Sequence, residues 1–111
     1  SMNDAEERVR EIANQVPAGE VISYGQIGRI AGLNPRMVGR IVARISASIP
    51  WWRVVRADGT PPACHGGTAG ALLEEEHIPF RNGKIDWSRL ERRETGRPEA
   101  ALPPGNKDAA Q

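Results

Sequence analysis

The stretch Ile49-Pro50-Trp51-Trp52-Arg53-Val54-Val55 decides how the rest of this chain is arranged. Two adjacent tryptophans stand here between a proline and an arginine, in a chain of 111 residues with only three Trp, one Tyr and one Phe. Aromatic surface is therefore concentrated at one point of the sequence. On residue type alone, the two indoles predict large apolar side chains that flank a short core strand from Arg53 to Arg56.

Upstream of this stretch, the sequence carries strong helix signals. A first helix is predicted over residues 3–15, because apolar residues recur there at the i, i+3, i+4, i+7 spacing of one buried face. Ser23 and Gln26 form a capping box that opens a second helix, and Gly32 ends it. The predicted core face of the second helix consists of Ile27, Ile30 and Ala31.

A third helix is predicted to begin with Asn34 as N-cap and Pro35 in the first turn. Its buried face is Val38, Ile41, Val42 and Ile45, and a second face carries Arg36, Arg40 and Arg44. Like charges at i, i+4 cost a helix about 0.2–0.5 kcal/mol per pair. No Asp or Glu occurs from residue 21 to 57, so the arginine row favours a polyanion as partner, and Gly39 leaves room for its close approach. The alternative is a solvated arginine face.

Downstream, the sequence predicts smaller elements. Asp58-Gly59 predicts a turn, and residues 61–67 predict a loop or wing tip because proline and glycine dominate them. Thr68 is expected to cap a short helix that extends to Glu76. Residues 78–80 and 84–87 then predict a terminal hairpin. These elements indicate one domain over residues 1–90, mainly α with a small β part, followed by a disordered tail over residues 91–111.

Composition excludes several classes of protein. The net charge of +1 with segregated arginines indicates a basic patch and not a generally basic protein. The single cysteine, Cys64, excludes an internal disulfide, and Cys64, His65 and His77 match no common zinc spacing, so neither a metal nor a cofactor is expected. No apolar run approaches the length of a membrane span. We expect a soluble, cytoplasmic monomer, associated with the nucleoid if the source is bacterial.

Four motifs taken together resemble the DNA-binding domain of the O-alkylguanine DNA alkyltransferases over roughly residues 5 to 90. In order, they are Val16-Pro17-Ala18-Gly19-Glu20-Val21, Ser23-Tyr24-Gly25-Gln26-Ile27, Arg36-Met37-Val38-Gly39 and the stretch of residues 49–55. The resemblance implies a winged helix-turn-helix fold. In that family the pattern is Pro-Cys-His-Arg-Val, and its cysteine accepts the alkyl group of a flipped guanine.

This sequence departs from the family pattern at the two reacting positions. Trp51 stands in place of the cysteine, and Trp52 stands in place of the histidine. An indole has no lone pair that can accept an alkyl group as a thiolate does. The chain therefore resembles the alkyltransferase-like proteins, which keep the fold without the nucleophile. The resemblance implies a protein that is not an enzyme.

The resemblance also implies a function and a set of site residues. The expected partner is double-stranded DNA with an alkylated guanine, which the protein would flip out, bending the DNA and passing the lesion to nucleotide excision repair proteins. Tyr24 would press on the phosphate beside the flipped nucleotide, and Arg36 would fill the vacated stack. The remaining DNA contacts would be Ser23, Gly39, Arg40 and Arg44. The lesion pocket would consist of Trp51, Trp52, Arg53 and the backbone around Val54 and Val55, with Trp51 beside the base and Trp52 largely in the core.

Two other functions compete with this interpretation. A winged-helix regulator without lesion preference would need only the basic helix. A residual alkyltransferase would use Cys64 with its neighbour His65, although sequence neighbours seldom pair as nucleophile and base. Cys64 or His65 would also stand where related proteins often carry a basic residue near the alkylated oxygen.

Overall fold

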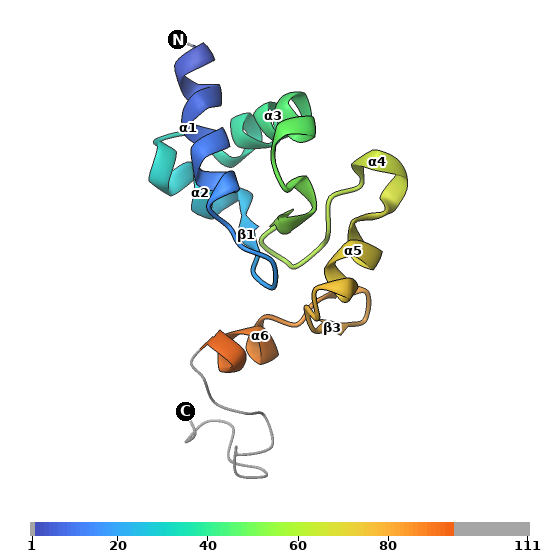
Figure 1. Ribbon diagram of the computed structural model, residues 1–111. Coiled ribbons are helices and arrows are strands. Elements are labelled where there is room, and N and C mark those ends of the chain that lie inside the picture. Colours follow the sequence, from blue (N-terminus) through green and yellow to red (C-terminus); the bar gives the residue numbers. More distant parts are fainter. Residues whose placement is uncertain (1, 95–111) are drawn as a thin grey trace.

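The computed structural model describes residues 2–94, and three helices form its N-terminal half. These are α1 (Met2–Asn14), α2 (Tyr24–Ala31) and α3 (Pro35–Ile45). Two short 3₁₀ turns follow, η1 (Ser46–Ser48) and η2 (Trp51–Arg53). The other elements are β1 (Ile22–Ser23), β2 (Val54–Val55), α4 (Cys64–Gly67), α5 (Ala69–Glu75), β3 (Phe80–Arg81), β4 (Lys84–Ile85) and α6 (Trp87–Glu94). Figure 1 shows α1, α2 and α3 gathered in one group, with α5, β3 and α6 on the other side of the short β1–β2 pair. The prediction of a mainly α fold with a small β part is confirmed.

Local capping signals set the ends of α2 and α3 as predicted. Ser23 Oγ accepts a hydrogen bond from the Gln26 backbone N–H at 3.1 Å, and Gln26 Oε1 accepts one from the Ser23 N–H at 2.8 Å. Asn34 Oδ1 accepts from the Met37 N–H at 2.8 Å, directly before α3. Gly32 ends α2 in the left-handed conformation, with φ of 76°. Each of the two helix starts is therefore fixed by hydrogen bonds between residues only three positions apart.

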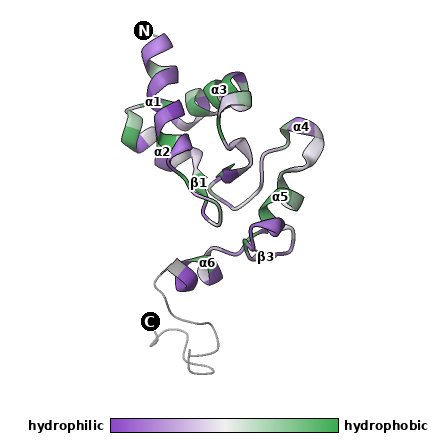
Figure 2. Ribbon diagram, in the orientation of Figure 1, coloured by the Kyte–Doolittle hydropathy of each residue, from purple (hydrophilic) through white to green (hydrophobic). Residues whose placement is uncertain are grey.

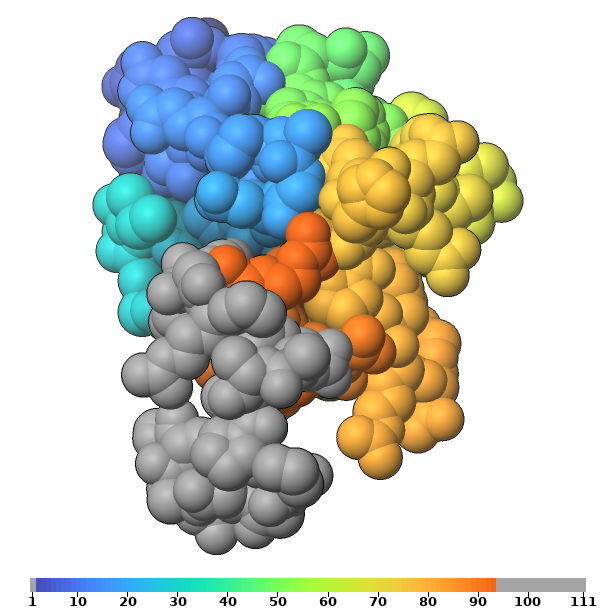
Figure 3. Space-filling view, turned by 60° about the horizontal axis from the view of Figure 1, so that its bottom comes forward, coloured from blue at the N-terminus to red at the C-terminus, as the bar shows by residue number. Residues whose placement is uncertain are grey.

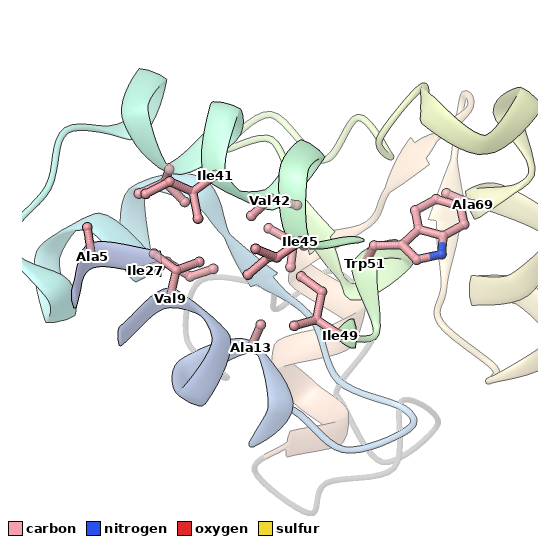
Figure 4. Packing of buried hydrophobic residues seen from close by; sticks show 12 residues of the cluster. Ala5, Val9, Ala13, Ile27, Ile41, Val42, Ile45, Ile49, Trp51 and Ala69 are labelled. Carbon is pink, nitrogen blue, oxygen red and sulfur yellow. The ribbon is translucent and has the colours of Figure 1, made fainter. Parts of the chain in front are cut away.

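The buried residues form two clusters that meet at β2. The first cluster lies between α1, α2 and α3 and includes Val9 and Ala13 of α1 and the predicted face of α3. Figure 4 shows Trp51 at its edge, with the indole extending toward Ala69 at the start of α5. The second cluster consists of Val55, Leu73, Ile78, Ile85 and Leu90. Adjacent strand residues point to opposite sides, so Val54 packs in the first cluster and Val55 in the second.

A parallel strand pair joins two segments that are far apart in the sequence. Ile22 pairs with Val54, and Ser23 pairs with Val55. A strand was predicted from residue 53 to 56, whereas none was predicted at residues 22–23. The observed strand is shorter, because Arg53 still belongs to the 3₁₀ turn. The pairing places the start of α2 beside the end of the tryptophan stretch.

One predicted core residue is exposed. Ile30 was assigned to the buried face of α2, but 67% of its surface is accessible. The buried face consists of Ile27, Gly28 and Ala31, and Ile30 lies beside it, over a groove of about 560 Å³ that Ile12 and Val16 also line. Figure 2 shows α1 and α6 largely in hydrophilic colours, with apolar colours on parts of α2 and α3.

The C-terminal part contains a helix that was not predicted. The hairpin pairs Phe80 with Ile85 and is shorter than predicted, because Trp87 already begins α6. Asp86 Oδ1 accepts a hydrogen bond from the Arg89 N–H at 3.2 Å and so caps this helix. Leu90 packs in the second cluster, and Figure 3 shows α6 in orange lying against the loop after α1 and against α5. Residues 91–94, predicted as part of a disordered tail, are helical. The rest of that tail, 95–111, lies outside the described residues.

Within residues 2–94, no helix combines the length and the apolar character that a membrane span requires. In the same part of the chain, no group of three or more His, Cys, Asp or Glu side chains is placed to hold a metal ion.

Candidate nucleic-acid interface

The outer face of α3 presents two of its three arginines freely. Arg36 and Arg40 are exposed, and neither forms an ion pair with another residue of the described part of the chain. Arg44 differs, because its Nε lies 3.4 Å from Glu6 Oε2 of α1. The expectation that no acid lies near the arginine row is wrong at this position, since α1 packs alongside α3 and brings Glu6 from outside the acid-free stretch. The free positive charge of α3 is concentrated toward its N-terminal half.

Gly39 lies on α3 between Arg36 and Arg40. A Cβ atom built at this position would meet no other atom within 4 Å. The absence of a side chain is therefore not required by packing within the protein. It leaves an open place on the helix surface where an anionic backbone could approach closely.

Tyr24 is the first residue of α2 and is half-buried. Burial raises the pKa of its phenol, and the neighbouring Cys64 raises it further, while Arg56 lowers it. The phenol is consequently protonated at neutral pH and can donate a hydrogen bond to a phosphate oxygen. Arg56 is exposed beside it and was not among the predicted site residues. The sequence does not show that Arg56 lies near Tyr24, because the two residues come together only through the parallel pairing of β1 with β2.

Ser23 has a structural role that the predicted DNA contact overlooked. The residue is buried, with 7% of its surface exposed, and its hydroxyl accepts the N–H of Gln26. By accepting this bond, the hydroxyl oxygen holds the first turn of α2 and so positions Tyr24. Ser23 is buried in the free protein, and its contact with DNA stays a prediction.

The two tryptophans lie at right angles to each other and differ in burial. Their ring centroids are 5.8 Å apart, with an interplanar angle of 85°. Trp51 is 9% exposed and belongs to the first core cluster, whereas Trp52 is half-buried and touches both clusters. The expectation that Trp52 would be the core residue of the pair is wrong in this respect. His65 stacks on the Trp51 indole, with centroids 4.1 Å apart and an interplanar angle of 25°.

Arg53 and Trp52 are held by Glu76, which was not among the predicted site residues. Arg53 donates from Nη2 to Glu76 Oε2 at 2.8 Å and from Nε to Oε1 at 3.0 Å, and the Trp52 indole N–H donates to Oε2 at 2.9 Å. The Gly19 N–H donates to Oε1 at 3.1 Å, and Arg53 Nη1 reaches the Val16 carbonyl at 3.0 Å. We call these contacts the Glu76 latch.

The Glu76 latch changes the predicted lesion pocket. The guanidinium of Arg53 is bound to Glu76, so it is not available to a base. The side chains of Val54 and Val55 are fully buried in the two clusters, which leaves only their backbone for the role assigned to them. Of the predicted pocket side chains, Trp51 is the one whose ring faces the loop of residues 61–67.

The predicted wing tip is an irregular loop. His65, Gly66 and Gly67 have φ of 56°, 71° and 73°, so α4 is a left-handed turn and not a regular helix. Cys64 is exposed with a free thiol. Thr68 stands before α5 as predicted, but its hydroxyl donates to the His65 carbonyl at 2.9 Å and does not cap the helix.

Most of the described part of the chain matches the model of a known protein family. The model of the 6-O-methylguanine DNA methyltransferase DNA-binding domain matches residues 4–78, which extend from α1 to the segment after α5. The match therefore includes the basic face of α3, Tyr24, the tryptophan pair and the Glu76 latch.

Individual relatives carry two kinds of name. A DNA base-flipping protein of Escherichia coli (strain K12) is 37% identical over 91 residues, which cover 75% of this chain and 70% of that protein. A methylated-DNA–protein-cysteine methyltransferase of Methanopyrus kandleri is 40% identical over 53 residues, covering 46% of this chain and 40% of that one. The crystal structure of S. pombe Atl1, bound to damaged DNA containing O6-carboxymethylguanine, is similar with a TM-score of 0.70 at 23% identity, over 81% of this chain and 95% of that one. The predicted alkyltransferase DNA-binding fold is confirmed.

Proposed function

Because this chain belongs to the 6-O-methylguanine DNA methyltransferase DNA-binding-domain family, as an alkyltransferase-like protein, we propose that it recognises O6-alkylguanine in duplex DNA. It binds the damaged duplex, flips the alkylated base out of the stack and holds it without removing the alkyl group. The names of relatives include both a base-flipping protein and a methyltransferase, so family membership alone leaves the chemistry open.

Trp51 is the observation that carries the proposal. The residue stands where the family motif has its acceptor cysteine, and Trp52 stands where the motif has its histidine. An indole at this place cannot accept an alkyl group, but it offers a broad aromatic face. Proteins that extrude a base commonly read it by stacking against such faces. The substitution therefore exchanges a reacting atom for a stacking surface at the same point of the fold.

The other residues of the interface suit the binding of the DNA backbone and the extrusion of a base. The neutral phenol of Tyr24 can donate to a backbone phosphate, and its place at the start of α2 is fixed by the Ser23 cap. Arg36 lies in the first turn of α3, where it can enter the stack that the base has left. Arg40 and Arg56 supply positive charge for phosphates, which gives binding a salt-dependent component that does not depend on sequence.

The direct test is a titration with two otherwise identical duplexes, one containing O6-methylguanine and one containing guanine. We expect tighter binding of the damaged duplex, measured by fluorescence anisotropy, and unmodified protein in intact-mass spectra after incubation with O6-benzylguanine DNA. Equal affinity for both duplexes would favour a winged-helix regulator, which should ignore the lesion. A benzyl adduct on Cys64 would show a residual alkyltransferase.

The Gly39→Ala variant tests whether DNA approaches α3 closely at this position, because its expected effects on DNA affinity and on the free energy of unfolding have opposite signs. Alanine in a helix is favoured over glycine by about 0.5–1 kcal/mol, and the methyl group has free space here, so the free energy of unfolding should rise slightly. DNA affinity should nevertheless fall, because the methyl group stands on the surface that meets the duplex. Denaturant unfolding and anisotropy measure the two effects.

Gly70→Ala is the matched control for Gly39→Ala. Gly70 lies in α5, and a Cβ built there also meets no atom within 4 Å. This variant should keep the parent affinity for DNA. If Gly39→Ala binds DNA as well as Gly70→Ala does, the surface around Gly39 is not in close contact with the duplex.

Transfer of the lesion to nucleotide excision repair stays a prediction from the resemblance. A pull-down of repair proteins with and without damaged duplex would test it.

A further inference from the structure

We propose that His65 occupies, in the free protein, the face of Trp51 on which the extruded base stacks, so that base capture displaces the imidazole. The inference rests on the proposed function and concerns the same site. It makes His65 a residue that sets how readily the pocket opens.

The contact geometry is that of a bound aromatic ligand. The imidazole lies nearly parallel to the indole, with ring centroids 4.1 Å apart. Its Nε2 lies at hydrogen-bond distance, 3.1 Å, from the hydroxyl of Ser46, which directly follows α3. An aromatic ring with a hydrogen-bonding edge thus already sits on Trp51, as a nucleobase would.

The rest of the Trp51 surface is not available for stacking. Trp52 meets the ring edge to face, and the core cluster of α3, Ile49 and Ala69 encloses it, leaving 9% exposure. Figure 4 shows the indole between this cluster and the start of α5. A base can therefore reach the indole face that His65 covers only if the imidazole moves away.

The segment that carries His65 allows the imidazole to move away from Trp51. His65 has φ of 56°, a left-handed conformation that is uncommon for residues with a side chain. Gly66 and Gly67 follow, also left-handed, and a Cβ on either would meet no atom within 4 Å. His65 itself is exposed, so displacement moves the ring into solvent without opening the core.

Competition for one face has a measurable consequence. A purine offers a larger ring area than an imidazole, so an extruded guanine stacks on Trp51 more strongly than His65 does. The imidazole must nevertheless be displaced before the guanine can stack. The apparent affinity for damaged DNA is lowered by the fraction of protein in which the face is free. From the usual strength of an aromatic pair, removing the ring should tighten binding of the O6-methylguanine duplex by about two- to tenfold.

The experiment compares His65→Gly and His65→Asn with the parent protein. Both replacements tolerate a left-handed φ, and Asn adds no backbone freedom, so a shared effect belongs to the lost ring. His77→Gly is the matched control, since His77 is also exposed with φ of 66°. Anisotropy with the O6-methylguanine and guanine duplexes measures affinity. In parallel, NMR of the parent follows the ring protons of His65, which the Trp51 ring current should shift upfield in the free protein.

We expect tighter binding of the damaged duplex by both His65 variants, no change with His77→Gly, and loss of the upfield shift when the parent binds damaged DNA. Three results would overturn the inference: no upfield shift in the free protein, a shift that persists in the complex, or weaker lesion binding after removal of the ring. The last would make His65 a contact of the lesion. Failure of the parent to prefer damaged DNA would instead reject the proposed function, and this inference with it.

Discussion

Glu76→Ala should lower the free energy of unfolding by about 3 kcal/mol, the lower end of the cost of removing one partner of a buried ion pair. The lower end applies because the side chains of Arg53 and Glu76 each keep 15% exposure. Without the carboxylate, the Arg53 guanidinium and the Trp52 indole N–H lose their shared acceptor. Gly19 loses its partner too, so the loop after α1 is released from α5. Urea denaturation measures the change.

The exposed neighbour Glu75 provides the control for this substitution. Glu75→Ala removes a carboxylate from the same end of α5, where it contacts solvent, and should change stability by no more than about 0.5 kcal/mol. A loss no larger for Glu76→Ala than for Glu75→Ala would show that the Glu76 latch behaves as a surface ion pair and does not hold the two clusters together.

The Glu76 latch should also make the fold sensitive to acid. Burial alone would raise the pKa of Glu76, but hydrogen bonds from Arg53, Trp52 and Gly19 outweigh it and lower the pKa below its usual value. A carboxyl with a depressed pKa contributes stability fully above its unfolded-state pKa and loses it as the pH falls through the folded-state value. Glu76→Gln should therefore be less stable than the parent at neutral pH, and the difference should shrink in acid.

Local signals allowed the helical half of the fold to be predicted from sequence. The capping box at Ser23, the Asn34-Pro35 start and the apolar spacing of α3 each act within a few residues, so the chain itself displays them. The same signals fixed Tyr24 and Arg36 at the beginnings of two helices. Ile30 was misplaced because apolar character alone does not say whether a helix position at the edge of the buried face has a neighbour to cover it.

Contacts between distant segments could not be predicted in the same way. Glu6 reaches Arg44, Glu76 reaches Arg53, and His65 reaches Trp51 only because helices and loops far apart in sequence pack together. Glu76 is the third of three consecutive glutamates, and nothing in its own surroundings separates it from the other two. Helix α6, in contrast, has a local signal in the sequence, because Asp86 is a possible N-cap. It was not predicted because residues 84–87 were assigned to a strand of the hairpin.

Arg36→Ala should remove most of the preference for damaged DNA while leaving the fold intact. Extruding a base costs a few kcal/mol, and the vacated stack must be filled. If Arg36 contributes about 2–3 kcal/mol of this, affinity for the O6-methylguanine duplex falls roughly 30- to 150-fold. The free energy of unfolding should stay the same or rise slightly, because a cation in the first turn of α3 opposes the helix dipole. Anisotropy and urea denaturation measure the two quantities.

Arg36→Lys distinguishes geometry from charge. A lysine keeps the positive charge but lacks the planar guanidinium that can replace a base in the stack. Binding to undamaged DNA should keep its salt dependence, whereas the fluorescence rise of 2-aminopurine placed at or beside the lesion should disappear. This outcome would separate Arg36 from an ordinary phosphate contact, which either cation can make.

Arg40→Ala and Arg44→Ala complete the comparison along α3. Arg40 is free to meet a phosphate, so its removal should weaken all duplexes alike, reduce the salt slope by about 0.9 and leave the 2-aminopurine signal intact at saturation. Arg44 is already paired with Glu6, so its removal should change the slope less. If Arg36→Lys flips bases as well as the parent does, Arg36 belongs with Arg40 as a phosphate contact, and the vacated stack must be filled by another residue.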